Sequence, residues 1–268
     1  MSAHVRLLAA LLAMFCAIGA SATLKKVKIG ELYYRIDTES RTATVTHSHP
    51  DIGIFHIAGS EIANENKKNN YAAGRIVIPS SVEYDGRRYT VDKIDRVAFL
   101  SSPIEECVIP KSVGAIQESA FSSSGVRSVT IESPDVKLSP FVFDHCENLR
   151  TVNLPEGLTE ISRYCFRYSG IQSLSLPQSV HTIGMCAFEN CNSLSSISIP
   201  ASLKEIGIGA FINCSKLPKL NLPANVKIGE EAFIGTVMTK KAAPTKKTST
   251  KKTSAKKQST KKRTSIYD

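Results

Sequence analysis

Phenylalanine recurs along the chain at an almost constant interval. Seven of these residues stand 22 or 23 positions apart: Phe99, Phe121, Phe143, Phe166, Phe188, Phe211 and Phe233. A fixed period of this length indicates a stack of one short structural unit, in which each unit buries its apolar side against its neighbours. We therefore expect a solenoid. Its thin core leaves little room for an enclosed active site, which favours surface recognition over catalysis.

Each repeat carries the same internal pattern, as the repeat beginning at Leu194 illustrates. Apolar residues alternate from Leu194 through Ile199, Pro200 follows, and the unit continues with Leu203, Ile206, Gly207 and Phe211. The period of two predicts a short strand with one buried face, and proline, which lacks a backbone donor, ends it. The apolar pair Leu203 and Ile206 predicts a tight turn or a short 3₁₀ or helical piece. We expect an α/β solenoid with a ladder of parallel strands.

The repeat L-x-x-I-x-I-P-x-S-V-x-x-I-G-x-x-A-F-x-x-C resembles the BspA-like leucine-rich repeats, from about Ile76 to Phe233. Two departures stand out. Pro134 lies two residues late, and serines or Tyr168-Ser169 replace the polar-cysteine corner in two repeats. The resemblance implies a secreted or cell-surface protein that mediates adhesion, with host matrix proteins such as fibronectin and fibrinogen as ligands.

Residues 1–22 have the features of a secretory signal peptide. An apolar run from Leu7 to Ile18 precedes the small-residue motif Ala20-Ser21-Ala22, which predicts cleavage near Ala22. The run is too short to span a bilayer as a helix. Export to a secreted, cell-surface or envelope location is therefore the prediction.

The remainder divides into three parts by composition. Residues 23–74 lack the 23-residue period and predict an N-terminal β cap, with strands near Leu32–Ile36 and Ala43–Thr46. Such a cap would cover the unpaired strand edge at that end of the solenoid. Residues 75–235 form the predicted solenoid, and its first coil contains a predicted hairpin with Asp85-Gly86 at the turn.

Residues 236–268 form a lysine-, serine- and threonine-rich tail that we expect to be disordered, because it has no apolar period. Its lysine pairs are Lys246, Lys247, Lys251, Lys252, Lys256, Lys257, Lys261 and Lys262. The tail accounts for the whole formal net charge of +10, so the rest of the chain is neutral. Paired lysines bind polyanions without sequence preference, and each contributes about 1 kcal/mol near an anionic membrane. An anionic polymer or membrane surface is the predicted partner, with no specific nucleic acid, and a flexible spacer is the alternative. The export signal argues against a nuclear or chromatin role.

The outward strand positions predict a ligand-binding face. One row comprises Thr130, Asn153, Ser175, Ser198 and Asn221, with Arg127 and Arg150 beside it. A second row comprises Ser128, Thr151, Ser173 and Ser196. Parallel pairing places such residues about 4.8 Å apart and suits a protein or glycan ligand. The alternative is that short polar side chains only keep the solenoid soluble.

The seven cysteines follow the repeat. Cys16 lies in the signal, Cys107 takes a strand position, and Cys146, Cys191 and Cys214 share one corner of the repeat. Buried free thiols are the expectation, since such residues behave as small hydrophobes. Disulfides and a metal site are the alternatives.

Two short motifs invite a chemical interpretation. His47-x-His49 with Asp51 has metal-ligand character, and Asp144-His145-Cys146 places an acid, a base and a thiol together. Three potential ligands in a polar loop are common by chance, and the second set lies at a repeat corner and has no spaced partner. No phosphate loop, G-x-S-x-G or H-E-x-x-H motif is present. We expect no catalytic residue, no metal, no cofactor and no enzymatic activity.

The sequence therefore predicts a monomeric, secreted or cell-surface binding protein. A structural or scaffold protein of the periplasm or cell envelope, with the tail as a spacer, is the alternative function.

Overall fold

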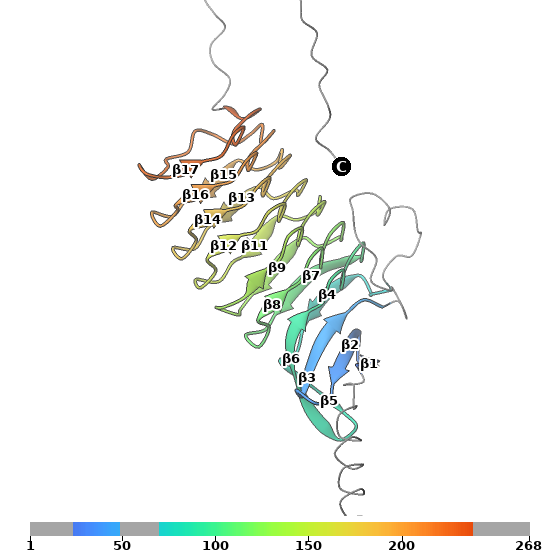
Figure 1. The fold of residues 1–268 in the computed structure, drawn as a ribbon. Helices are drawn as coiled ribbons and strands as arrows, with labels where there is room; N and C mark the ends of the chain where they lie inside the picture. The colour runs from blue at the N-terminus through green and yellow to red at the C-terminus, as the bar shows by residue number, and fades with distance from the viewer. Residues whose placement is uncertain (1–23, 49–69, 238–268) are drawn as a thin grey trace, which may run out of the picture.

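The computed structural model describes residues 24–48 and 70–237 as a stack of coils with an antiparallel cap at one end (Figure 1). Within these ranges there are strands and turns but no α-helix. The predicted signal, all the paired lysines of the tail and residues 49–69 lie outside them. The domain boundaries at the two ends therefore stay predictions.

The cap begins with a three-stranded antiparallel meander. Its strands are β1 (Lys25–Ile29), β2 (Leu32–Asp37) and β3 (Thr42–Thr46). The sequence predicted the second and third of these. β3 then pairs in parallel with β6 (Arg87–Ile94), which joins the meander to the first coil. The edge of the solenoid is covered by this pairing.

The predicted hairpin in the first coil is present. It consists of β5 (Ser81–Tyr84) and β6, paired antiparallel. The turn residues Asp85 and Gly86 have φ of 50° and 67°, and two successive positive φ values are the mark of a type I′ turn.

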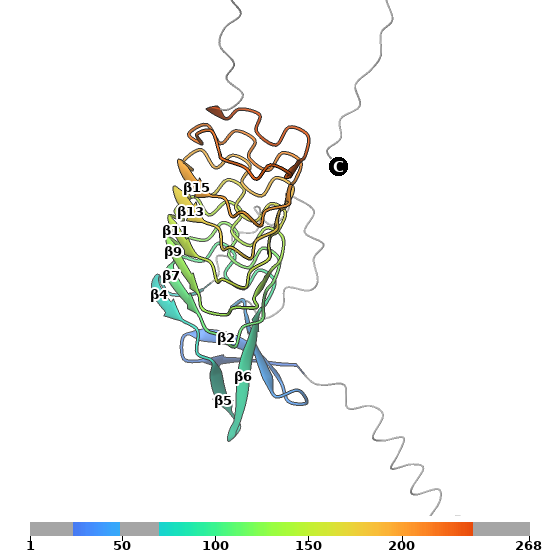
Figure 2. The same ribbon diagram turned by 90° about the vertical axis from the view of Figure 1, so that its left-hand side faces the viewer.

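The first wall of the solenoid holds the predicted parallel strands. One ladder contains β4 (Gly74–Val77), β7 (Ile104–Ile109), β9 (Ser128–Ile131) and β11 (Thr151–Asn153). A second ladder contains β13 (Ser173–Ser175) and β15 (Ser196–Ser198). Figure 2 shows these strands side by side along one edge of the molecule. The buried residue of each strand pairs with its counterpart one coil on, such as Leu174 with Ile197.

The second wall corrects the expectation of an α/β solenoid. Where a turn or helical piece was expected, the chain forms two-residue strands: β8 (Ala115–Ile116), β10 (Lys137–Leu138), β12 (Glu160–Ile161), β14 (Thr182–Ile183), β16 (Glu205–Ile206) and β17 (Lys227–Ile228). β8 pairs with β6 and β10 pairs with β8, so these two strands extend the sheet of the cap. β12, β14, β16 and β17 form a separate parallel ladder. Each short strand pairs in parallel with its counterpart on the next coil, so the backbone groups of this wall are satisfied between coils and not within a helix. The fold is a parallel β-solenoid.

The third wall, which we call the turn wall, contains the phenylalanines. Backbone N–H groups here donate to carbonyls of the next coil, as Tyr164 does to Met185 (3.0 Å), Phe166 to Ala187 (2.8 Å) and Tyr168 to Glu189 (2.8 Å). The residues two before and two after each phenylalanine have positive φ. The first column is Val97, Ser119, Phe141, Tyr164, Cys186, Gly209 and Glu231, and the second is Ser101, Ser123, His145, Tyr168, Asn190, Asn213 and Gly235.

Stacked phenylalanine rings form the centre of the core. From Phe99 to Phe233 the ring centroids of adjacent coils lie 4.9–5.4 Å apart, and Tyr71 extends the stack beyond Phe99. The rings up to Phe211 are fully buried, whereas Phe233, in the last coil, is partly exposed. Ring burial of this kind is the main favourable contribution that each coil gains from its neighbours.

Corner cysteines line one side of this stack. The thiols of Cys146, Cys191 and Cys214 donate to the carbonyls of Phe121 (3.0 Å), Phe166 (2.9 Å) and Phe188 (3.0 Å) of the preceding coils. All six cysteines within the described ranges are free, and five of them are buried. The expectation of buried free thiols is confirmed for those five.

Candidate functional site

The polar rows predicted on the strands lie on the outer surface of the first wall, which we call the strand face. Thr130 pairs with Asn153 and Ser175 pairs with Ser198. Ser175 Oγ and Ser198 Oγ lie 3.0 Å apart, and Asn153 Nδ2 lies 3.5 Å from Thr130 Oγ1. The second row is also in register, with Ser128 beside Thr151 and Ser173 beside Ser196. Polar groups therefore repeat along the solenoid axis at the strand spacing.

The row is not one uninterrupted ladder. The two ladders of the first wall separate between β11 and β13, which lie next to each other in Figure 2 without being joined as one sheet. Asn221 is exposed, but it belongs to no strand. The predicted positions thus fall into a group on β9 and β11, a group on β13 and β15, and Asn221 beyond them.

The two arginines beside the row differ in their surroundings. Arg150 Nη1 donates to the carbonyls of Glu147 (2.8 Å), Leu149 (3.0 Å) and Gly170 (3.1 Å). Gly170 belongs to the next coil, so Arg150 ties the coils together where the two ladders separate. A side chain at Gly170 would collide with this guanidinium. Arg127 is exposed, and its contact with Glu105 at 3.8 Å leaves it accessible to a ligand.

Sequence reasoning missed an apolar extension of the strand face. Val108 pairs with Thr130, and Val77 pairs with Val108, so both continue the first row toward the cap. Val77 is 55% exposed. The signal was present in the sequence, because both valines occupy the outward positions of alternating strands. Near the cap the first row of the strand face is therefore apolar, whereas the second row continues with the ion-paired side chains of Glu106 and Arg75.

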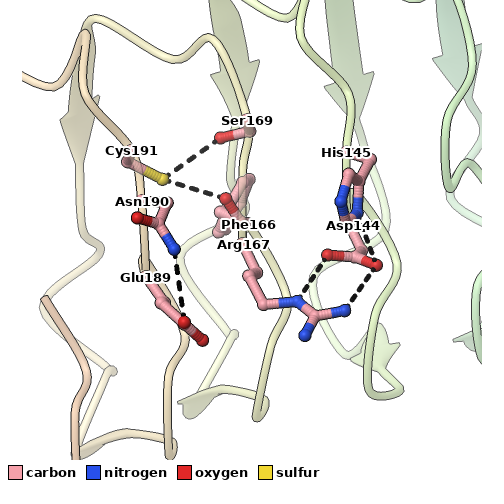
Figure 3. Close-up of polar contacts among 8 residues, drawn as sticks. All are labelled: Asp144, His145, Phe166, Arg167, Ser169, Glu189, Asn190 and Cys191. Atoms are coloured by element: carbon pink, nitrogen blue, oxygen red, sulfur yellow. Dashed lines mark hydrogen bonds and ion pairs between the residues drawn. The ribbon is translucent and has the colours of Figure 1, made fainter. Parts of the chain in front are cut away.

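The Asp144-His145-Cys146 motif does not assemble into a catalytic group. His145 Nδ1 lies 3.0 Å from Asp144, whose carboxylate also binds Arg167 (Figure 3). Cys146 is fully buried and donates to the carbonyl of Phe121 in the core. Burial raises the pKa of its thiol to about 12. A buried, protonated thiol of this kind is a structural cysteine.

The predicted metal motif is only partly described. His47 is buried and its Nδ1 lies 3.3 Å from Lys26 Nζ, while His49 and Asp51 fall outside the described ranges. Within residues 24–48 and 70–237, no group of three or more His, Cys, Asp or Glu side chains is arranged to hold a metal ion. The same ranges contain no helix with the length and apolar character needed to cross a bilayer.

Comparison with known families gives a match over most of the chain. The profile described as "BspA type Leucine rich repeat region" matches residues 87–169 and 136–260, in six copies. Among curated proteins, none matches the sequence.

Several solved bacterial structures are similar to this chain. A leucine-rich repeat protein from Bacteroides ovatus is 25% identical, with a TM-score of 0.64 over 79% of this chain and 57% of that one. A leucine rich cell surface protein from Faecalibacterium prausnitzii is 25% identical, with a TM-score of 0.46 over 79% and 56%. The pneumococcal vaccine antigen PcpA is 18% identical, with a TM-score of 0.48 over 80% and 69%. The chain thus spans a little over half the length of the first two, and the first supports the leucine-rich repeat solenoid.

Proposed function

The chain belongs to the BspA-type leucine-rich repeat family, and on that premise we propose that it is a secreted or cell-surface binding protein. It recognises a protein or glycan ligand through the strand face and contacts anionic surfaces through its basic tail. The ligand class that the family resemblance suggests is a host matrix protein such as fibronectin or fibrinogen.

The observation that carries this proposal is the register of the strand face. Hydroxyl and amide groups stand at corresponding positions of adjacent strands, where Ser175 and Ser198 are hydrogen-bonded and both exposed. Short polar side chains on paired strands lose little conformational entropy on binding. Such a surface is preorganised for an extended ligand.

The core gives a reason to propose a non-catalytic role. The space between the three walls is filled by the phenylalanine stack, whose rings from Phe99 to Phe211 are fully buried. Enzyme sites need a concave, partly dry pocket that brings reacting groups together. Because the interior of the solenoid is filled, a ligand would bind to the outer surface of its walls.

Surface plasmon resonance on immobilised fibronectin and fibrinogen tests the strand face. The variant Ser175→Arg with Ser198→Arg places two bulky cations in the centre of the row. The matched control is Ala201→Arg with Ala224→Arg, which adds the same charge at exposed positions outside the described strands. We expect the wild type and the control to bind at least one of the two proteins, and the strand-face variant to bind about tenfold more weakly.

Two results would contradict the proposal. One is equal binding by the strand-face variant and the control. The other is no binding of either matrix protein by the wild type, which would favour the structural role in the envelope.

A further inference from the structure

The turn wall carries an aromatic cluster that is separate from the strand face. Its two positive-φ columns hold small residues in most coils, such as Ser119 and Ser123 before the cluster and Gly209 and Asn213 after it. In two adjacent coils they hold four rings instead: Phe141, Tyr164, His145 and Tyr168. Bulky side chains are uncommon at positive φ, so these four residues, unlike the positive φ itself, set the two coils apart from the others.

The four rings form two stacked pairs. Phe141 and Tyr164 lie 4.7 Å apart at 5°, and His145 and Tyr168 lie 4.6 Å apart at 21°. Each pair occupies one column. One face of each tyrosine is therefore covered by the preceding coil, and the other face is turned toward the following coil, where the column residues are Cys186 and Asn190.

Arg167 fixes the cluster between the two columns. Its guanidinium carbon lies 5.4 Å from the ring centroid of Phe141, 5.1 Å from that of Tyr164 and 5.7 Å from that of Tyr168. Nε and Nη2 donate to the buried carboxylate of Asp144, so the side chain points toward the preceding coil (Figure 3). The positive charge of Arg167 is thus already balanced, and the ring positions are preorganised.

The following coils supply polar groups beside the two tyrosines, of which Tyr168 is 41% exposed and Tyr164 is half-buried. Asn190 Nδ2 donates to Glu189 Oε1 at 3.2 Å, and Asn213 Nδ2 donates to Asn190 Oδ1 at 2.9 Å. Glu189 and Asn190 lie one coil beyond Arg167 in Figure 3. The column residues after Tyr164 and Tyr168 are smaller, so the side chains change in height between these coils. We call this place the step. The rings of Tyr164 and Tyr168 form its higher side, and the amide and carboxylate groups of Glu189, Asn190 and Asn213 form its lower side.

We propose that this step on the turn wall binds a neutral oligosaccharide. A pyranose ring presents a C–H face that packs on an aromatic ring, and a rim of hydroxyls that pairs with amide and carboxylate groups. Tyr164 and Tyr168 provide the ring surfaces, and Glu189, Asn190 and Asn213 provide the polar groups. Their arrangement on consecutive coils allows more than one sugar unit to be contacted.

Two other ligand classes fit less well. An acidic polymer would need an unbalanced cation, but Arg167 is paired with Asp144, and Glu189 stands beside it. A stable protein partner buries about 800 Å² on each side, whereas the aromatic cluster covers only two coils, whose ring spacing in the core is 5.3 Å. A short chain of sugars matches this extent.

Saturation-transfer-difference NMR with maltotetraose, cellotetraose and tetra-N-acetylchitotetraose tests the proposal, with irradiation of the aromatic protons. The test variant is Tyr164→Ser with Tyr168→Asn, which installs the residue types that other coils carry in the same columns. It should fold, because asparagine tolerates positive φ better than tyrosine. Tyr168→Phe keeps the ring and serves as the matched control, and circular dichroism checks the fold of both.

We expect saturation transfer to at least one tetrasaccharide for the wild type and for Tyr168→Phe. The double variant should bind it about tenfold more weakly, while Ser175→Arg with Ser198→Arg on the strand face should not change it. Absence of transfer to all three sugars overturns the proposal, as does unchanged transfer in the double variant. If the double variant loses matrix-protein binding instead, the cluster is a protein contact and the sugar assignment is wrong.

Discussion

Arg167 donates two hydrogen bonds to Asp144 of the preceding coil, from Nε to Oδ1 at 2.9 Å and from Nη2 to Oδ2 at 3.2 Å. The Asp144 side chain is 9% exposed, so its carboxylate depends on this partner for much of its solvation. Replacement by Arg167→Gln leaves a buried carboxylate with a weaker partner, and we expect a loss of about 1–3 kcal/mol in the free energy of unfolding. Urea denaturation measures it.

A matched control comes from the exposed pair Arg88 and Glu83, 3.3 Å apart and more than 70% exposed on both sides. Arg88→Gln should cost less than about 1 kcal/mol. The double variant Asp144→Asn with Arg167→Gln should lose less free energy of unfolding than the sum of the two single variants. The reason is that each single change already removes the same interaction between Arg167 and Asp144. Equal losses for Arg88→Gln and Arg167→Gln would show that the Arg167 contact has no special role in stability.

The phenylalanine stack predicts a gradient of stability effects along the chain. Phe188 is fully buried and stacks on both sides, at 5.3 Å from Phe166 and 5.1 Å from Phe211. Phe233 is partly exposed, and its ring stacks on that of Phe211 at 5.3 Å. Phe188→Ala should lower the free energy of unfolding by about 3–5 kcal/mol, and Phe233→Ala by about 1–2 kcal/mol. Chemical denaturation that ranks Phe233→Ala as the more damaging change would refute the stacked core.

Sequence patterns predicted the parts of the fold that have a period. Alternation around Leu174 and Ile197 identified the strands of the first wall, and Asp85-Gly86 identified the hairpin turn, because each signal lies within a few adjacent residues. The aromatic at each coil was predicted from Phe99 to Phe233. Tyr71, which extends the stack, was missed because it stands 28 residues before Phe99 and outside the regular interval.

The second and third walls could not be predicted in the same way. A two-residue strand such as Thr182–Ile183 has no alternation of its own and is defined only by pairing with the next coil. The positive-φ columns are usually signalled by glycine, but here glycine appears in them only at Gly209 and Gly235. Tyr164 and Tyr168 therefore carried no backbone signal, and the cluster around Arg167 became visible only once the coils were stacked.

Cys186 is expected to be the accessible thiol among the cysteines that the structure describes. It is half-buried, whereas the other five are buried. Burial and the nearby Glu189 raise its pKa to about 11. Because the thiolate is the reactive form, the rate of iodoacetamide labelling should rise about tenfold for each pH unit between about pH 7 and pH 9.

Labelling of a chain that starts at Thr23, and so lacks Cys16, measures this rate by mass spectrometry. Cys186→Ser should remove labelling of the native protein, and Glu189→Gln should speed labelling at a given pH, because the carboxylate no longer holds the pKa up. Persistent labelling of native Cys186→Ser would mean that a thiol described as buried is exposed.

The proposed function requires that the protein reaches the cell surface and is held there, so fractionation of producing cells is the most direct test. The full chain is compared with a chain that ends at Val237. We expect the full chain in the envelope fraction at low salt and released at high salt, since polyanion contacts weaken steeply with salt, and the shortened chain in the medium. Recovery of both chains in the cytosol would contradict a secreted or cell-surface function.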